Sequence, residues 1–557
     1  MRTIIVGGVA GGASAATRLR RLDESHEIVV LERSGYVSFA NCGLPYYIGG
    51  TIADRRSLLL QTPASLNARF ALDVRVNSEV IGIDPVGQSV TVRDLTDGHE
   101  YTEHYDHLVL SPGATPIVPD MPGVERALTL RTIEDTDRIK AQVDGLIGSQ
   151  DSSEESVGGS PLAAVIVGAG FIGLEMAESL RERGMDVTVV ELGSQVMAPL
   201  DPEMAAIVAA ERRANGVQLA LGVQLTEIRA ESVLLSDGSE LDADLVLMSI
   251  GVRPDVTLAK AAGLKLGPRG GIAVDSQMRT SDPRIFAVGD AVDKQDATSG
   301  EATLVPLANS ANRQGRLVAD AIAGREVRFG GVLGTAIVKV FSLTVAVTGA
   351  NEKKLRAAGR RYQAIHTHPG SHAGYYPGAD RISLKLLFDP DNGQILGAQG
   401  VGRAGTDKRI DVLATAMTGG IRADELADLE LAYAPPYGSA KDPVNQLGYV
   451  ADNLMTGTVR TIGWDQVDAI DRYLVDVRSP GEHRRGHLEG SVNLPVDELR
   501  TRHTEIPRRA DGTPMPVAVY CQVGQRGHTA ARLLSQLGYD VVNLDGGWLT
   551  HQLAHAG

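Results

Sequence analysis

The segment AAVIVGAGFIGLEMAESLRERGMDVTVVELG constrains the fold more than any other part of the chain. An apolar strand pattern runs into a glycine turn and an alanine-containing helix pattern, and a second apolar strand pattern ends on Glu191. Gly168, Gly170 and Gly173 keep the G-x-G-x-x-G spacing that lets a backbone approach a pyrophosphate at a helix N-terminus. The spacing therefore predicts a βαβ unit that binds a dinucleotide.

The acidic end of this unit indicates which nucleotide it prefers. The Glu191 carboxylate accepts a hydrogen bond from a ribose 2′-hydroxyl and repels a 2′-phosphate. The following residues, LGSQVMAP, contain no Arg or Lys to favour the phosphate. We expect NADH as the electron donor, with NADPH left open, and we include Gly251 in the nucleotide-binding set.

The N-terminal segment RTIIVGGVAGGASAATRLRRL repeats the same order of strand, glycine turn and helix. Val9 stands where the strict pattern has its second glycine, between Gly7 and Gly12, so this motif is weak alone. The next strand pattern, HEIVVLER, ends on Glu32 and Arg33. Two concordant motifs with two acidic strand ends predict two dinucleotide folds in one chain.

Composition excludes several classes of function. The net charge of −15 over 557 residues opposes general binding to nucleic acid or anionic membranes. Two cysteines cannot form a disulfide framework, and no apolar run reaches the length of a membrane span. The first residues enter a strand pattern without a leader-like segment, so we expect a cytoplasmic protein.

Two further segments carry a family resemblance. YDHLVLSPGATP (105–116) and TSDPRIFAVGDAVD (280–293) resemble the flavin-binding motifs of two-dinucleotide flavoproteins. Residues 1–450 as a whole resemble the pyridine nucleotide-disulfide oxidoreductases. The resemblance implies bound FAD, held in part by Ser111, Gly113 and Asp290.

Cys42 lies in SFANCGLPYYIGG, with no second cysteine near enough to pair with it. A lone cysteine is often only a small buried apolar residue. This segment, however, closely resembles the active-site segment of the coenzyme A-disulfide reductases. The resemblance implies that Cys42 alternates between a thiolate and a mixed disulfide with CoA, flanked by Ser38 and Asn41. A helix N-terminus at this cysteine is expected to lower its pKa.

Single-cysteine NADH peroxidases and water-forming oxidases are the alternative, because they resemble the same domains and cycle through a sulfenic acid. They carry a histidine in the first glycine loop, whereas residues 7–12 of this chain read GGVAGG. We therefore favour a sulfur substrate over peroxide or oxygen.

CoA also requires cations for its phosphates. Arg18 and Arg21 are three residues apart on the first predicted helix and could share a face, and Arg55 and Arg56 follow the cysteine segment. Solvated helix charge explains each of these arginines equally well.

The segment APPYGSAKDPVNQLGY strongly resembles the interface segment of CoA-disulfide reductases, in which a tyrosine replaces a His–Glu pair. The resemblance implies that Tyr437, with Tyr375 or Tyr376, reaches across a homodimer interface to the partner's redox cysteine and donates protons. Tyrosines that merely pack in an interface are the alternative. His366, His368 and His372 lack an established ligand spacing, so we assign no metal.

Cys521 ends the strand pattern VAVYC and begins a predicted loop over 522–527 before the helix HTAARLLSQLG. Loop amides and a helix N-terminus directed at one sulfur stabilise a thiolate or persulfide, and Arg526 adds a cation. The last hundred or so residues closely resemble a rhodanese sulfurtransferase domain. Its signatures are matched by Asp476, Arg478, Glu482, His487, Gly546, Gly547 and Trp548. An inert rhodanese fold kept for binding is the alternative.

The predicted fold class is α/β: a flavoprotein with FAD and NAD Rossmann-like domains, an α+β dimerisation domain and a C-terminal α/β rhodanese domain. The predicted segments are the N-terminal portion of the FAD domain (1–147), a flexible insert (148–161), the NAD domain (162–274), the return to the FAD domain (275–328), the dimerisation domain (329–452) and the rhodanese domain (453–557).

Together these features predict an NADH-dependent flavoprotein that reduces CoA disulfide, CoA persulfide and polysulfide through Cys42, with sulfane sulfur carried by Cys521. Three alternatives stay open: the peroxidase or oxidase chemistry above, reduction of a sulfur-carrier protein docked on the rhodanese domain, and plain CoA-disulfide reduction with the C-terminal domain a minor accessory.

Overall fold

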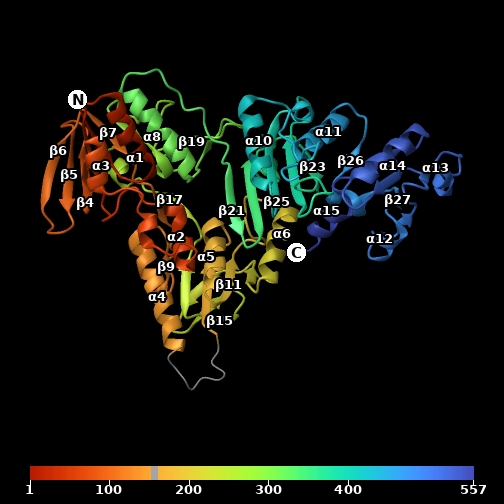
Figure 1. The fold of residues 1–557 in the computed structure, drawn as a ribbon, viewed down its shortest axis with the longest axis horizontal. Helices are drawn as coiled ribbons and strands as arrows, with labels where there is room; N and C mark the ends of the chain where they lie inside the picture. Colours follow the sequence, from red (N-terminus) through yellow and green to blue (C-terminus); the bar gives the residue numbers. More distant parts are fainter. Residues whose placement is uncertain (152–160, 557) are drawn as a thin grey trace. The chain divides into compact units, whose positions relative to one another are not determined.

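The structure of the chain is a computed structural model that describes residues 1–151 and 161–556. The chain divides into two compact units (Figure 1). Unit 1 comprises Met1–Ser194 and Gly216–Gly334, and unit 2 comprises Gln195–Asn215 and Thr335–Gly557.

The first nucleotide fold of unit 1 is built on a parallel five-stranded sheet in the order β18-β7-β1-β2-β3. Its strands are β1 (Arg2–Val6), β2 (Glu27–Leu31), β3 (Asp73–Arg75), β7 (His107–Leu110) and β18 (Ile285–Ala287). Successive residues of a strand face opposite sides, so Ile4 and Ile5 enter two separate apolar cores. Both faces of this sheet are thus covered, as a parallel sheet requires.

Helices α1 (Ala10–Leu22) and α8 (Ala308–Ile322) pack closely on one face of this sheet. Their contact depends on bare backbone, because a Cβ at Gly315 would lie 2.1 Å from the carbonyl oxygen of Gly11. Segments about 300 residues apart in the sequence are therefore joined in one domain, as the predicted return to the FAD fold requires.

Smaller elements complete the flavin fold. An antiparallel sheet contains β4 (Ser78–Asp84), β5 (Ser89–Asp94) and β6 (Glu100–His104), and the short pairs join β8 (Ala114–Pro116) with β17 (Val252–Pro254) and β19 (Lys294–Gln295) with β20 (Ala302–Thr303). The short helices are α2 (Leu44–Gly49), α3 (Pro63–Phe70) and α7 (Thr257–Ala261).

The second nucleotide fold is a parallel sheet in the order β12-β11-β10-β16-β9. Its strands are β9 (Leu128–Thr129), β10 (Ala163–Val167), β11 (Asp186–Glu191), β12 (Gln218–Leu221) and β16 (Leu245–Met248), and helix α5 (Phe171–Glu182) follows β10. Between β12 and β16, the chain forms a separate antiparallel sheet of three strands, β13 (Leu225–Ile228), β14 (Ser232–Leu235) and β15 (Glu240–Asp242). The two sheets confirm the predicted pair of Rossmann-like folds.

The predicted flexible insert, 148–161, overlaps the end of helix α4 (Ile133–Asp151). The helix therefore continues into the beginning of that segment. Residues 152–160 lie outside the described residues.

Unit 2 contains an antiparallel sheet in the order β21-β22-β25-β24-β23. Its strands are β21 (Ala336–Val340), β22 (Leu343–Gly349), β23 (Gln363–Thr367), β24 (Ile382–Phe388) and β25 (Ile395–Gly402). Helices α10 (Thr406–Gly419) and α11 (Pro443–Met455) pack on it through a wholly apolar cluster, and α9 (Glu352–Ala357) follows β22. This is the predicted α+β interface domain.

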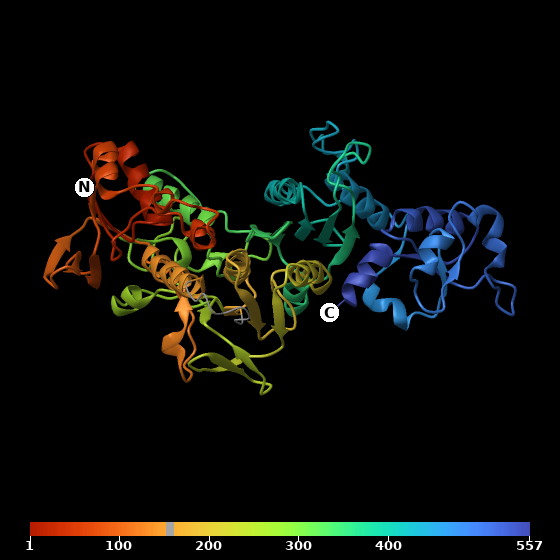
Figure 2. The same cartoon turned by 60° about the horizontal axis from the view of Figure 1, so that its bottom comes forward.

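Helix α6 (Pro202–Ala214) comes from the segment predicted as NAD domain but belongs to unit 2. It packs against β21, β22 and β25 and against the C-terminal helix α15 (Gly547–Ala554), beside which it lies in Figures 1 and 2. Local sequence could not reveal this, because a strand–helix–strand pattern says nothing about which sheet receives the helix.

The C-terminal domain of unit 2 is a parallel sheet in the order β26-β30-β29-β27-β28, drawn in blue in Figure 2. Its strands are β26 (Thr461–Ile462), β27 (Tyr473–Asp476), β28 (Val492–Asn493), β29 (Val517–Tyr520) and β30 (Val541–Leu544). Besides α15, the domain contains the helices α12 (Pro480–Arg484), α13 (Leu499–Arg502) and α14 (Gln525–Gln536). Cys521 follows the buried strand β29 directly, as predicted.

Across the described residues, every helix is too short or too polar to cross a membrane.

The α1–α8 contact gives a stability prediction with a matched control. Gly315→Ala forces a Cβ into the Gly11 carbonyl and should destabilise unit 1 by roughly 1–3 kcal/mol. Gly145→Ala, on an exposed stretch of α4 where a Cβ meets no atom, should be neutral or stabilise by up to about 1 kcal/mol. Thermal unfolding midpoints measured side by side should move in opposite directions. Equal unfolding midpoints for the two variants would show that α1 and α8 can move apart to accommodate the added methyl group without loss of stability.

Candidate functional site

A large cavity in unit 1 gathers most of the residues predicted to bind the flavin. Its volume is about 980 Å³, at the upper end for ligand sites. It is lined by the β1–α1 turn, the end of β2, the cysteine segment and the loops after β7 and β18. The predicted residues among its walls are Gly7, Glu32, Arg33, Ser38, Asn41, Cys42, Ser111, Gly113 and Asp290.

The walls fit a dinucleotide. A Cβ at Gly12 would lie 1.8 Å from the Gly7 carbonyl oxygen, and one at Gly7 would lie 2.2 Å from that of Ser111, so the turn is as tight as its backbone allows. This closeness brings the first amides of α1 to the cavity, where they favour anions. The Asn41 carboxamide oxygen is buried and lacks a partner within the described residues, so it can accept from a bound group.

Glu32 closes the same turn. Its carboxylate accepts from the backbone N–H groups of Gly8 at 2.8 Å and Ser34 at 3.0 Å. A carboxylate has about four lone-pair sites, so capacity for a ribose hydroxyl is left after these two bonds. Glu32 therefore fixes the loop, and its predicted role in binding a ribose stays a prediction.

Asp290 lies in the turn after β18 and forms an ion pair with Arg131 at 3.0 Å. Both side chains line the cavity. Two side chains fix the backbone of this turn. The Gln314 side-chain oxygen accepts from the Gly289 N–H, and the Lys294 ammonium donates to the Gly289 carbonyl. Sequence reasoning missed Arg131, since it lies 159 positions from its partner outside any motif.

Cys42 lies in a 3₁₀ turn, Asn41–Gly43, and is exposed towards the cavity. Burial around the thiol and the nearby Glu175 carboxylate raise its pKa, and Arg131 opposes this. The expected lowering by a helix N-terminus is therefore wrong for this structure. The physical reason is that α2 has six residues and starts only after the turn, so desolvation outweighs its weak field.

The NAD fold repeats the geometry of the flavin turn. A Cβ at Gly173 would lie 2.0 Å from the Gly168 carbonyl oxygen, whereas one at Gly170 would meet nothing within 4 Å. Internal packing thus requires the outer two glycines, and the middle one leaves bare backbone for a pyrophosphate. Glu191 accepts from the Ala169 and Gly193 N–H groups at 2.8 and 2.7 Å, as Glu32 does in the first fold. Gly251 adopts a φ of 115°, which favours glycine.

The candidate CoA arginines lie in different environments. Arg18 is paired with Asp320 at 2.7 Å, Arg21 is exposed, and neither is part of the cavity wall. Arg55 pairs with Asp137, and Arg56 with Asp54. Arg69 does line the cavity, beyond Leu60 and Gln61, and forms no ion pair within the described residues. It is better placed for a phosphate than the predicted pair, and no motif marks it in the sequence.

Cys521 is fully buried at the start of a short loop in unit 2. The predicted loop, 522–527, is shorter in the structure because α14 begins at Gln525, with Gly524 before it at a φ of 94°. The direction of its amides towards the sulfur stays a prediction. Arg526 is held by Glu482 through two bonds of 2.8 and 2.6 Å, which raise the pKa of the guanidinium, and the nearby Cys521 sulfur adds a smaller contribution.

The other rhodanese-signature residues support this loop. Arg478, buried against Tyr520 and Trp548, forms an ion pair with Asp476 and donates to the side-chain oxygen of Gln522 at 3.2 Å. Trp548 donates its backbone N–H to the Cys521 carbonyl at 2.7 Å. His487 stacks on His483, whose Nδ1 lies 2.9 Å from the Asp476 carboxylate.

The predicted proton donors are exposed tyrosines of unit 2. Tyr375, Tyr376 and Tyr437 are 76, 43 and 74% exposed, and the Tyr375 hydroxyl lies 2.7 Å from that of Tyr433. One backbone bond, from the Ala373 N–H to the Gly438 carbonyl, ties their loops together, and the Tyr437 N–H donates to the Ala434 carbonyl within the second loop. Exposed aromatic side chains on an ordered pair of loops suit a protein interface.

The three histidines considered for a metal make separate contacts. His366 binds Glu203 and Asp545, His368 binds Ser383 and Thr550, and His372 makes an edge-to-face contact with Tyr376. The assignment of no metal stays a prediction.

Comparison with known proteins places this geometry in a family. The family model for pyridine nucleotide-disulphide oxidoreductases matches residues 1–315, the model for the dimerisation domain of that family matches 335–443, and a rhodanese-like domain model matches 461–552. A coenzyme A disulfide reductase from Staphylococcus haemolyticus is 36% identical over 454 residues, which are 81% of this chain and 100% of the relative.

Two solved structures match nearly the whole chain. The reduced CoADR-RHD of Bacillus anthracis is 47% identical with a TM-score of 0.95, covering 99% of this chain and 98% of that one. An NAD-dependent persulfide reductase from A. fulgidus is 36% identical with a TM-score of 0.89, covering 99% and 100%. The chain therefore belongs to the pyridine nucleotide-disulphide oxidoreductase family, as an enzyme that uses FAD and a pyridine nucleotide and carries a C-terminal rhodanese-like domain.

Proposed function

We propose that this enzyme uses NADH to reduce CoA disulfide, CoA persulfide and polysulfide, and that it does so through Cys42. One observation carries the proposal: Cys42 lies in the wall of the flavin cavity, and the only other cysteine of the chain, Cys521, belongs to the other unit. A thiol without a neighbouring thiol must form its disulfide with the substrate. The similar proteins named above, a CoA disulfide reductase and a persulfide reductase, support this choice of substrate.

Bound FAD supplies the relay that carries two electrons from a hydride donor to sulfur. Its proposed ligands are Gly7, Glu32, Ser111 and Asp290, which line the cavity. Arg131 neutralises Asp290 and keeps its carboxylate fixed. The proposed NADH ligands are Gly168, Gly170, Gly173, Glu191 and Gly251.

Cys42 is the nucleophile of the proposed sulfur chemistry. Its thiolate attacks the CoA-bound sulfur of CoA persulfide, forms a Cys42–S–S–CoA bond and releases hydrosulfide; with CoA disulfide it releases CoA thiolate. Two electrons and one proton then return Cys42 to the thiolate and release CoA thiol. The sum for the persulfide is CoA-SSH + NADH → CoA-SH + HS⁻ + NAD⁺.

We further propose a homodimer in which Tyr437, assisted by Tyr375 or Tyr376, protonates the departing thiolate at the partner's redox cysteine. Matching of a dimerisation-domain model supports the dimer. The hydrogen bond between the Tyr375 and Tyr433 hydroxyls raises the pKa of Tyr375, and a protonated phenol can donate.

Cys521 is proposed to carry sulfane sulfur as a persulfide and to exchange it with the CoA thiol or polysulfide. The held arginine, Arg526, and the loop amides support a bound anionic sulfur.

Removing each thiol should separate the two roles. We expect Cys42→Ser to abolish oxidation of the NADH-reduced enzyme by CoA disulfide, CoA persulfide and polysulfide, because a hydroxyl at this position does not ionise at neutral pH. Cys521→Ser should slow only the polysulfide reaction. Anaerobic stopped-flow absorbance of the flavin measures both. Rapid oxidation by hydrogen peroxide alone would instead favour the peroxidase alternative, and full turnover of Cys42→Ser would exclude the proposed route.

The tyrosines can be separated by single hydroxyl deletions. Tyr437→Phe should lower kcat for CoA disulfide by about a hundredfold, the lower end for loss of a general acid. Tyr449→Phe is the matched control, since Tyr449 is also exposed in the same domain but lies on α11. A larger effect of Tyr376→Phe than of Tyr437→Phe would reassign the donor.

The phosphate site can be tested with charge deletions. Arg69→Ala should raise the KM for CoA disulfide about tenfold, the loss expected for one charged hydrogen bond, without changing kcat. Arg21→Ala, which removes an equally exposed charge outside the cavity, should leave the KM unchanged. A larger rise in KM for Arg21→Ala than for Arg69→Ala would instead favour the phosphate-binding arginines suggested by the sequence. Steady-state rates at fixed ionic strength give both constants.

A further inference from the structure

The rhodanese domain is joined to the interface domain by a buried ionic contact inside unit 2. His366, on β23, places its Nδ1 2.5 Å from the carboxylate of Asp545, and its backbone N–H donates to the same carboxylate at 3.0 Å. Its Nε2 lies 3.0 Å from the carboxylate of Glu203 on α6. The three side chains are at most 8% exposed, so the contact is made out of reach of water.

A second, neutral contact runs beside the first. His368 is two residues along from His366 and so points to the same face of the sheet. Its Nε2 lies 2.8 Å from the Thr550 hydroxyl on α15, and its Nδ1 lies 2.9 Å from Ser383. Burial and the neighbouring His366 charge lower the pKa of His368 to about 3, so this ring is neutral.

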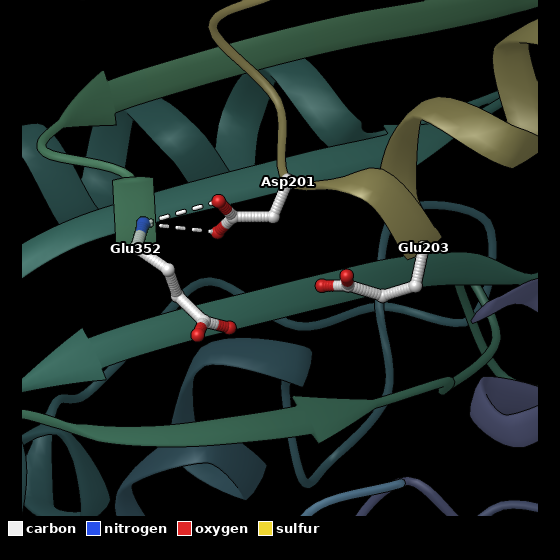
Figure 3. A group of neighbouring side chains, drawn as sticks. All are labelled: Asp201, Glu203 and Glu352. Carbon is white, nitrogen blue, oxygen red and sulfur yellow. Dashed lines mark hydrogen bonds between the residues drawn. The ribbon is translucent and has the colours of Figure 1, made fainter. Parts of the chain in front are cut away.

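The ionic contact belongs to a larger charged cluster. Lys385 is paired with His366 across β23 and β24, and its ammonium contacts the carboxylates of Asp201, Glu203 and Glu352. Figure 3 shows the three acids converging, with the Glu352 backbone N–H donating to Asp201. A lysine ammonium of the chain therefore contacts all three acids, and we assign this group no metal.

The contact leads directly to the sulfur-carrying loop. Asp545 precedes the Gly546–Gly547 turn, after which Trp548 and Leu549 donate to the carbonyls of Cys521 and Gln522 at 2.7 and 3.0 Å. The turn has no room to shift: a Cβ at Gly546 would lie 2.8 Å from the His366 Cβ, and one at Gly547 would lie 2.5 Å from the Cys521 carbonyl oxygen.

We propose that the His366–Asp545 bridge holds the Cys521 loop in a fixed position on the interface domain, so that sulfur leaves the rhodanese domain from a held site rather than from a loosely tethered module. His366 and Asp545 are positioning residues in this scheme, because they act on Cys521 through the turn. The scheme rests on the proposed role of Cys521 as a sulfur carrier in turnover.

The test compares three reactions of the full-length holoenzyme. CoA disulfide reduction uses Cys42 alone, sulfur transfer from thiosulfate to cyanide uses Cys521 alone, and NADH-dependent polysulfide reduction uses both. We expect Asp545→Asn to leave the first two within about twofold and to lower the third about tenfold, the change for one charged hydrogen bond. Asp540→Asn is the matched control, because Asp540 forms exposed ion pairs with Arg460 and Arg472 in the same domain.

Hydrogen–deuterium exchange of residues 521–527 gives a readout that does not depend on turnover. Exchange should rise in Asp545→Asn and stay unchanged in Asp540→Asn. Unchanged exchange, or a polysulfide rate equal to that of the control, would overturn the positioning role. Equal loss of all three reactions would also overturn it, since the cluster would then serve stability alone. If Cys521→Ser keeps full polysulfide reduction, the carrier role fails instead, and exchange still reports whether the loop is held.

The pH profile supplies a further readout. His366 faces Asp545, Glu203, Lys385 and His368; burial would lower its pKa, but the Asp545 charge and the two hydrogen bonds raise it to about 9. A histidine whose pKa is raised in the folded state stabilises its contacts fully at pH values below its ordinary pKa of about 6.5. This stabilisation is lost as the pH rises through the pKa of the folded state. The ratio of polysulfide to CoA disulfide reduction should thus fall near pH 9 in the unaltered enzyme and stay flat in Asp545→Asn. A flat ratio in both would contradict the proposal.

Discussion

The closeness of backbone to backbone at the two glycine turns is the constraint on which the nucleotide sites depend. In each fold, a carbonyl of the first glycine occupies the place where a Cβ of the last glycine would lie, at 1.8 Å for Gly12 and 2.0 Å for Gly173. The helix can start immediately after the strand only because both residues lack side chains. Glu32 and Glu191 then tie the turn to the next strand by accepting from its amides. The carboxylates that hold the turns are also the ones proposed to bind the ribose.

Sulfur chemistry adds a different requirement, because the two thiols need unlike surroundings. Cys42 is exposed in a cavity wall, where it can meet a substrate as large as CoA. Cys521 is buried under a short loop held by Arg478, Trp548 and Leu549 through their donated hydrogen bonds. An open thiol suits exchange with a bulky disulfide, whereas a buried one would protect a persulfide from solvent and from adventitious thiols. The different surroundings of the two cysteines fit the separate roles proposed for them.

Sequence predicted those features of the structure whose cause is local. The glycine turns, the acidic strand ends and the strand before Cys521 are each encoded within about 30 residues, the length of a βαβ unit. Arg131 and His366 were missed as functional partners because each contacts residues more than about 20 positions away, where spacing carries no information. No motif marks Arg69, and the local pattern around helix α6 does not show that it packs in unit 2. The pKa of Cys42 also depends on Glu175, which comes from the other nucleotide fold.

The contrast between His366 and His368 shows how a fold assigns charge to identical side chains. Both are buried on one face of the same sheet, so burial alone would keep both neutral. His366 has a carboxylate at each ring nitrogen and becomes charged, whereas His368 has two hydroxyl partners and stays neutral. Because a buried charged pair is costly to break once formed, the charged histidine fixes the docked position, while the neutral one adds contact without pH dependence. A junction built from both types therefore holds the rhodanese domain at neutral pH and makes that hold sensitive to a single proton.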